Sequence, residues 1–197
     1  MKKLIIIGAN NFQLPLILKA REMGIETHVF AWLDGAVGKI HADFFYPVSI
    51  TDKELILEYA YKIKPDGIIS IGSDLAMHTV NFIAFKLGLV GNSMECTQLT
   101  THKYMMRKAL SINGLPCPSF KIAKDKNDIG DLNLQYPLIV KPTDRSGSRG
   151  VTKVLSQEML QPAVERAFYE PFNKEIIVKK RKQRNIYVAL RNSLKKD

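Results

Sequence analysis

The sequence predicts an α/β fold in which a parallel sheet comes first and a small α+β unit follows it. In the first ninety residues, short apolar runs typical of strands buried on both faces alternate with segments of helical periodicity. After Gly91 the pattern changes to four strand-like runs with one helix among them. The chain has 197 residues, of which 46% are hydrophobic and 24% charged, so its composition is that of a folded globular protein.

Strands are expected in the first part at residues 4–7, 28–32 and 68–71, with a helix after each. The first helix begins at Pro15 and ends before Gly24, because proline suits a first helical turn and glycine follows a last one. The second begins at residues 51–54 (Thr-Asp-Lys-Glu), which match a capping box with threonine as the N-cap. The third is capped by Ser73 or Asp74.

The second part begins with a helix from about residue 101, which is expected to end at Gly114 because Pro116 and Pro118 prevent its continuation. Its inward side chains are expected to be Met105, Met106, Ala109 and Leu110. Further strands are expected at residues 119–123, 138–141, 151–155 and 176–178, with a helix at residues 162–169. The domains predicted from this pattern are 1–92, a connecting helical segment at 93–116, a small domain at 117–178 and a basic tail at 179–197.

The net charge of +10 is concentrated at the C-terminus. Residues 179–197 hold eight of the 29 basic residues and one of the 19 acidic ones, so this tail carries +7 of the total. The remainder is close to neutral for its size, which weakens the argument for a nucleic-acid-binding domain. The two cysteines have no C-x-x-C spacing, and the initial apolar run is too short for a secretory signal or a membrane span. A cytoplasmic protein is expected, without a membrane or a disulfide scaffold.

Two turns at strand ends are weak candidates for anion binding. Residues 8–11 (Gly-Ala-Asn-Asn) follow the first strand, but a dinucleotide fingerprint needs three glycines and only Gly8 is present. Residues 71–74 (Ile-Gly-Ser-Asp) end another strand, and a simple helix cap explains them equally well. A nicotinamide-dependent dehydrogenase is therefore poorly supported.

A lysine followed by a glycine-rich loop is a stronger candidate. Lys141 ends the apolar run 138–141, and residues 145–151 (Arg-Ser-Gly-Ser-Arg-Gly-Val) turn into the next strand. A lysine at a strand end is a fixed positive charge, and glycines let several backbone N–H groups approach phosphate oxygens. An ordinary hairpin tip is the alternative. Lys103 and Arg107, one turn apart, would alone be a solvated basic face.

The order of these segments resembles the ATP-grasp superfamily, in particular biotin carboxylase, the large subunit of carbamoyl-phosphate synthase and related carboxylate–amine ligases. The resemblance rests on residues 101–107 (Thr-His-Lys-Tyr-Met-Met-Arg), 114–118 (Gly-Leu-Pro-Cys-Pro), 139–142 (Ile-Val-Lys-Pro) and 146–151 (Ser-Gly-Ser-Arg-Gly-Val). It covers residues 1 to about 178. It implies a Rossmann-like pre-ATP-grasp domain followed by the lid of an ATP-grasp domain.

The resemblance implies that Lys103 and Lys141 contact the phosphates of ATP. Residues Ser146, Gly147, Ser148, Arg149 and Gly150 match the family's flexible lid loop. The implied reaction activates a carboxylate or bicarbonate as an acyl phosphate, which an amine then attacks, with ATP and Mg²⁺ as cofactors. Lysines and loop amides suit phosphoryl transfer because that reaction depends on positioning and on neutralising charge.

The chain departs from this family after Val178. The family continues with acidic residues near the adenine and then with the domain that holds magnesium, whereas here residues 179–184 are Lys-Lys-Arg-Lys-Gln-Arg. One hypothesis is a truncated or frame-shifted ligase that is inactive alone, and downstream DNA encoding an out-of-frame continuation would support it. The alternative function is a module that binds nucleic acid or another anion through its polybasic tail. A third is a nucleotide-binding partner of a separately encoded catalytic domain; association into a homo-oligomer is also left open.

Overall fold

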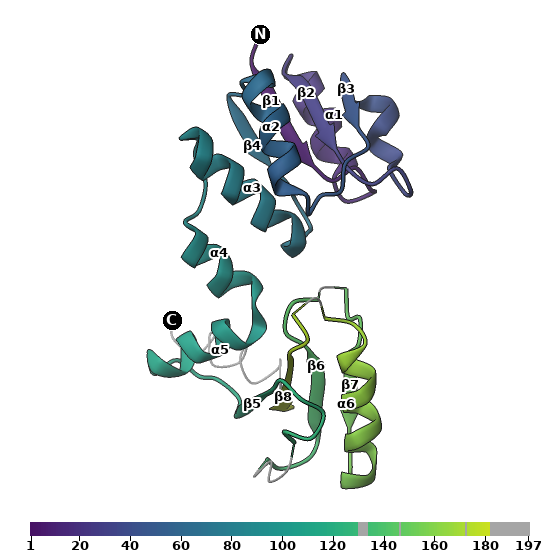
Figure 1. Ribbon diagram of the computed structural model, residues 1–197, viewed down its shortest axis with the longest axis vertical. Helices are drawn as coiled ribbons and strands as arrows, with labels where there is room; N and C mark the ends of the chain where they lie inside the picture. Colours follow the sequence, from purple (N-terminus) through teal and green to yellow (C-terminus); the bar gives the residue numbers. More distant parts are fainter. Residues whose placement is uncertain (130–133, 146, 172, 182–197) are drawn as a thin grey trace, which may run out of the picture. The chain divides into compact units, whose positions relative to one another are not determined.

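The computed structural model describes residues 1–129, 134–145, 147–171 and 173–181 (Figure 1). The chain divides into two compact units, residues 1–106 and residues 107–197. The first contains a parallel sheet and the second an antiparallel sheet. The mixed α/β class expected from the sequence is therefore confirmed.

The sheet of the first unit has the strand order β3-β2-β1-β4, and each neighbouring pair is parallel. Its strands are β1 (Lys3–Ile7), β2 (Glu26–Phe30), β3 (Phe44–Tyr46) and β4 (Gly67–Ile69). In the register, Ile5 lies opposite His28 on one side and Ile68 on the other. The carboxyl ends of these strands therefore meet at one edge of the sheet.

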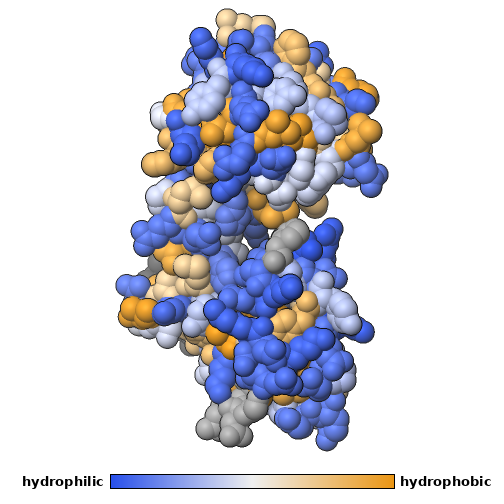
Figure 2. Space-filling model, viewed as in Figure 1, coloured by the Kyte–Doolittle hydropathy of each residue, from blue (hydrophilic) through white to orange (hydrophobic). Residues whose placement is uncertain are grey.

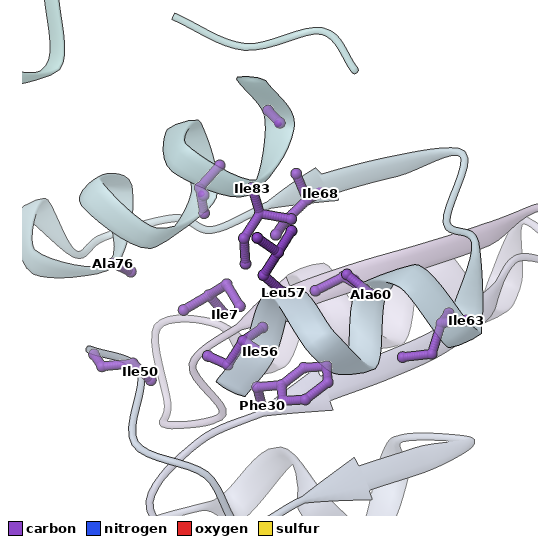
Figure 3. Close-up of a cluster of buried hydrophobic side chains, with 13 residues drawn as sticks. Ile7, Phe30, Ile50, Ile56, Leu57, Ala60, Ile63, Ile68, Ala76 and Ile83 are labelled. Carbon is purple, nitrogen blue, oxygen red and sulfur yellow. The ribbon is translucent and has the colours of Figure 1, made fainter. Parts of the chain in front are cut away.

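Helices cover both faces of this sheet. On one face lie α2 (Lys53–Ile63) and α3 (Asp74–Leu87), and Ile7, Phe30, Ile56 and Ile83 form a fully buried core between these helices and the strands (Figure 3). On the other face α1 (Leu14–Glu22) packs with the 3₁₀ helix η1 (Val37–His41), and it buries Ile17 against the sheet. Burial on both faces explains why β1 is apolar at consecutive positions.

The helix caps correct one expectation and decide another. Asp52, not Thr51, caps α2: its carboxylate accepts a hydrogen bond from the backbone N–H of Leu55 at 3.2 Å. The Thr51 hydroxyl instead pairs with that of Ser49 at 2.8 Å. For α3, Ser73 is the N-cap, since its hydroxyl accepts from the N–H of Ala76 at 3.2 Å.

The region after α3 holds two helices where the sequence predicted one. These are α4 (Met94–Thr101) and α5 (Lys103–Ile112). The amide of Asn81, which is buried in α3, donates to the hydroxyl of Thr97 at 2.8 Å and so fastens α4. The expectation that α5 turns Met105, Met106, Ala109 and Leu110 into a core is wrong, because none of these residues is buried and Met105 is 37% exposed.

A carboxylate joins β2 to the segment before β3. Asp43 Oδ2 accepts hydrogen bonds from the backbone N–H and the hydroxyl of Thr27, both at 2.8 Å. These bonds hold the pKa of Asp43 below its ordinary value of 3.8. The carboxylate therefore stabilises the fold at neutral pH, and this contribution is lost as the pH falls through the lowered pKa.

We expect Asp43→Asn to lower the free energy of unfolding by about 1 kcal/mol at pH 7, since a neutral amide is a weaker acceptor and the partly exposed site is screened by solvent. In urea titrations, the difference from the wild type should shrink as the pH is lowered below the ordinary pKa. A difference that does not change with pH would show that the charge of Asp43 is not its cause.

The second unit has two layers. Its antiparallel sheet has the order β5-β8-β6-β7, made of β5 (Phe120–Ala123), β6 (Leu138–Pro142), β7 (Thr152–Val154) and β8 (Ile176–Lys180). One face is covered by α6 (Leu160–Phe168), which the short helix η2 (Gln157–Met159) precedes. The core between the layers includes Leu138, Val140, Val164 and Ile176, each at most 1% exposed.

The last strand runs further than expected, to Lys180 instead of Val178. The backbone N–H of Lys180 donates to the carbonyl of Ser119, and that of Arg181 donates to the carbonyl of Pro137, both at 2.9 Å. The first residues of the polybasic segment are thus part of the sheet.

The visible face of the second unit is predominantly hydrophilic (Figure 2). Both cysteines are free thiols, with Cys96 exposed and Cys117 half-buried. Within the described ranges, no helix has the length and apolar character needed to cross a membrane.

Candidate nucleotide-binding site

The face of the antiparallel sheet opposite α6 carries two lysines. Side chains alternate along a strand, so the burial of Leu138 and Val140 under α6 assigns Ile139 and Lys141 to the other face. In β8 the same alternation assigns Ile177 and Lys179 to that face. Because Lys141 pairs with Ile177 and Ile139 pairs with Lys179, the two lysines are diagonal neighbours among apolar side chains.

The loop that follows Lys141 is fastened at its base. Thr143 is fully buried, and its N–H donates to the carbonyl of Glu175 at 3.1 Å. Its hydroxyl lies 2.9 Å from the amide nitrogen of Asn173, whose backbone N–H donates to Asp144 at 3.0 Å. The guanidinium of Arg145 donates to the carbonyl of Glu170. These contacts join the start of the loop to the segment that leads into β8.

The residues at the tip of the loop are exposed to solvent. Gly147, Ser148 and Arg149 are exposed, and φ is positive at Gly147 (67°), Ser148 (58°) and Gly150 (63°). A side chain on Gly150 would lie 3.0 Å from Pro142 Cγ and from Glu170 Cγ, so this position needs glycine for its φ angle and for space. Ser146 lies outside the described residues. An anchored base, with an exposed tip whose residues have positive φ angles, suits a loop that binds an anion through backbone N–H groups.

The lysine expected to be the other phosphate ligand belongs to the first unit. Lys103 is the first residue of α5 and is half-buried, whereas Lys141 and the loop are in the second unit. The structure thus brings Lys141 together with residues 147–150, and it describes Lys103 separately from them. Arg107, one turn after Lys103, falls in the second unit.

The two turns at the carboxyl edge of the parallel sheet have structural explanations. Gln13 is 1% exposed, its amide donates to the carbonyl of Ile71, and its side-chain oxygen accepts from the N–H of Asn10 at 3.3 Å. The Asn10 side chain accepts from the N–H of Phe12 at 2.8 Å. The turn at 8–11 is therefore filled by Gln13, and the turn at 71–74 serves the cap of α3.

Three features of the second unit escaped sequence reasoning. Arg145 was grouped with the loop, but it binds a protein carbonyl. Asn173 fastens the base of the loop from 30 residues away, and no local pattern marks such a contact. Lys179 was assigned to a tail, but it lies in β8, where burial and the positive charge of Arg107 lower its pKa. The apolar run 176–178 signalled the strand but not where it ends.

A cavity of about 610 Å³ in the second unit lies elsewhere. Its lining includes Lys126, Phe168 and Tyr169, and the Lys126 ammonium lies 5.5 Å from the centre of the Tyr169 ring. Neither Lys141 nor the loop 147–150 is among its lining residues. The candidate site therefore consists of Lys141 and the loop 147–150 and does not include this cavity.

Magnesium has no evident protein site in the part of the chain that the structure describes. No group of three or more His, Cys, Asp or Glu side chains there is arranged to hold a metal ion. Magnesium is bound through carboxylates together with substrate phosphates and water. The described residues therefore fit the phosphates of a nucleotide better than they fit the metal.

Comparison with known proteins connects this geometry to a family. The family model described as the C-terminus of D-ala D-ala ligase matches residues 110–196, which include the lysine, the loop and β8. Formate-dependent phosphoribosylglycinamide formyltransferase of Corynebacterium efficiens is 29% identical over 169 residues, covering 84% of this chain and 42% of the relative. The carbamoyl phosphate synthase large chain of Thermotoga petrophila is 26% identical over 128 residues, which are 63% of this chain and 11% of the relative.

Solved structures share the fold. The L-amino acid ligase of Bacillus licheniformis superposes with a TM-score of 0.75 at 22% identity, covering 92% of this chain and 44% of that one. An N5-carboxyaminoimidazole ribonucleotide synthetase in complex with ADP also gives 0.75, at 18% identity, and covers 92% and 47%. The chain thus spans less than half the length of these relatives. The comparisons give no support to nucleic-acid binding, and residues 182–197 of the tail lie outside the described ranges. In motif order, fold and relatives, this chain is similar to members of the ATP-grasp superfamily.

Proposed function

We propose that this chain is the ATP-binding part of a carboxylate–amine ligase, in which ATP converts a small-molecule carboxylate or bicarbonate to an acyl phosphate and an amine attacks it. The names of its relatives support this reaction class, because they include an L-amino acid ligase and a carboxyaminoimidazole ribonucleotide synthase from Aspergillus clavatus in complex with ATP. Residues 1–92 would be the pre-ATP-grasp domain, residues 93–116 a connecting segment and residues 117–178 the lid.

The observation that carries the proposal is the direct connection of a lysine to an anchored loop. Lys141 lies at the end of β6, and the loop turns back at Gly150 against Pro142, the last residue of that strand. The ammonium groups of Lys103 and Lys141 would neutralise charge on the phosphates. The loop from Ser146 to Gly150 would close over them, with its backbone N–H groups as donors.

The isolated chain is proposed to bind nucleotide weakly and not to complete the reaction. It aligns with about two-fifths of its formyltransferase relatives, and the remaining part of such an enzyme, or a separately encoded polypeptide, would supply the acceptor pocket and the ligands of Mg²⁺. Mixing the chain with a candidate catalytic polypeptide should then restore ligase turnover, measured as ADP release that depends on carboxylate and amine.

We expect Lys141→Met to weaken ATP binding by roughly 10- to 100-fold, because it removes a charge-assisted hydrogen bond to phosphate worth about 1.5–3 kcal/mol. Isothermal titration calorimetry of the full chain with ATP, with and without Mg²⁺, measures the effect. Methionine keeps much of the side-chain volume and removes the charge, so the sheet should be retained.

The matched control is Lys121→Met. Lys121 is an exposed lysine of β5 that pairs with Val178 and so belongs to the α6 side of the same sheet. This variant should bind ATP as the wild type does. Equal losses in both variants would mean that ATP responds only to net charge, and the assignment of Lys141 would fall.

A further inference from the structure

The second unit contains two half-buried cations that interact electrostatically, Arg107 in α5 and Lys179 in β8. Burial lowers the pKa of Lys179, and the charge of Arg107 lowers it further. Like charges repel more strongly when protein atoms replace the water around them. The structure therefore contains a pair of positive groups whose arrangement costs free energy unless a negative group joins them.

Cys117 connects the elements that carry the two cations. Its sulfur lies 3.7 Å from Arg107 Nη1 and 3.8 Å from the carbonyl oxygen of Arg107. Three residues later Phe120 pairs with Lys179 across β5 and β8. The hydrogen bond from Lys180 to Ser119 continues this pairing. The short segment from Cys117 to Phe120 thus fixes Arg107 beside the end of β8.

The guanidinium of Arg107 has a donor that is not used. Its Nε atom is buried and has no hydrogen-bond partner among the described residues. Its Nη1 faces a thiol, which is a weak acceptor. Within the same described ranges, neither Arg107 nor Lys179 forms an ion pair with a carboxylate. A buried donor without an acceptor is costly, so an external acceptor would be favoured here.

We propose that Arg107 and Lys179 form a binding site for a phosphate group. The guanidinium would offer its Nε–H to one oxygen, and the ammonium would act as a point charge on another. Two cations match the charge of a phosphate near neutral pH, which approaches −2, better than that of a carboxylate. This site goes beyond the proposed function and does not rest on it, since it uses neither Lys103 nor Lys141 nor the loop 146–150.

Inorganic phosphate is the direct probe. We expect the full chain to bind phosphate saturably when phosphate replaces chloride at constant ionic strength, measured by calorimetry and by the rise in unfolding temperature. Lys179→Met and Arg107→Met should each weaken this binding at least about tenfold, because each removes a charged donor. An absence of saturable phosphate binding would overturn the proposal.

Lys180→Met is the matched control. Lys180 is the next residue of β8, its side chain lies on the opposite face of the sheet, and its ammonium donates to Gln135 at 2.7 Å. The Lys180→Met variant removes one positive charge from the same strand but from the opposite face of the sheet, so it should leave phosphate binding unchanged. A loss equal to that of Lys179→Met would mean diffuse attraction to the basic segment, and the site would be rejected.

A second readout separates binding from misfolding. Without phosphate, Lys179→Met should unfold at a temperature no lower than the wild type, because it removes a charge that burial disfavours. In the wild type, phosphate should shift the ¹H–¹⁵N resonance of Arg107 Nε, and this shift should vanish in Lys179→Met. A resonance that does not respond in the wild type would contradict the role of Arg107. Lys179→Gln serves in place of the methionine variant if that variant fails to fold.

The source of the phosphate is decided by comparing inorganic phosphate with ATP. If the ligand is the free ion, Lys141→Met should retain the wild-type affinity for phosphate, and ATP should not compete with it. If it is a phosphate of the nucleotide, ATP should displace inorganic phosphate in the wild type and do so less effectively in Lys141→Met. Either pattern supports the site. Failure of Lys141→Met to change ATP binding would count against the proposed function and leave the phosphate titration unaffected.

Discussion

Ile176→Ala should lower the free energy of unfolding of the second unit by about 2–5 kcal/mol and leave the first unit unchanged. Ile176 is fully buried in β8, which lies between β5 and β6, so truncation would leave a cavity against the core under α6. The strands around it are paired and cannot collapse easily into that space. The loss of unfolding free energy should therefore be much larger than that caused by substituting an exposed residue.

Hydrogen exchange measured residue by residue would follow the two units separately. In Ile176→Ala, exchange should accelerate in the strands of the second unit and stay constant in β1 and β2. Leu155→Ala is the control, because Leu155 is in the same unit and is 55% exposed; it should change the stability by less than about 0.5 kcal/mol. Faster exchange in β1 as well would show that the two units unfold together.

Gly150→Ala should weaken ATP binding by tenfold or more. At φ +63° an L side chain is strained by about 1–2 kcal/mol, and the new Cβ would also meet Pro142 and Glu170 at 3.0 Å. Both contacts lie at the base of the loop, so relieving them would displace the segment that follows Lys141. Calorimetry with ATP measures the loss, and circular dichroism verifies that the sheet is retained.

Gly147→Ala separates the two contributions. Gly147 has nearly the same φ, +67°, but a Cβ there would meet no atom within 4 Å. It bears the backbone strain alone, and its effect on ATP binding should be several-fold smaller than that of Gly150→Ala. If the two variants lose the same affinity, the close packing of Gly150 against Pro142 has no part in shaping the loop.

The alternation of strands and helices was predictable because it depends on local patterns. Strand β1 and helix α2 lie within one or two residues of the expected positions, since a buried strand and an amphipathic helix each have a distinct hydrophobic period. Besides the two short 3₁₀ helices, one strand and one α-helix were missed. Strand β3 is only three residues long, and α4 contains several threonines, which are weak helix formers, so its stability depends on contacts with α3.

The exact ends of helices, the burial of a helix face and the contacts between distant residues could not be predicted from the sequence. The choice of Asp52 over Thr51 as a cap depends on a difference of one residue in where the helix begins. The expected burial of Met105 failed because periodicity shows which side chains share a face but not whether another element covers it. In the candidate site, Lys141 and the loop were identifiable from their order, whereas Asn173 and the environment of Lys179 arise only when the chain folds.

The continuation of β8 to Lys180 has a practical consequence for anyone who shortens this protein to study its basic end. Removing everything after Val178 would remove the backbone N–H groups of Lys180 and Arg181, which donate to the carbonyls of Ser119 and Pro137. The last hydrogen bonds on both sides of the strand would then be lost. Any loss of anion affinity in that deletion would then have two causes, the disrupted end of the sheet and the missing positive charges. A deletion that begins after Arg181 keeps these hydrogen bonds, so it tests the effect of the charges alone.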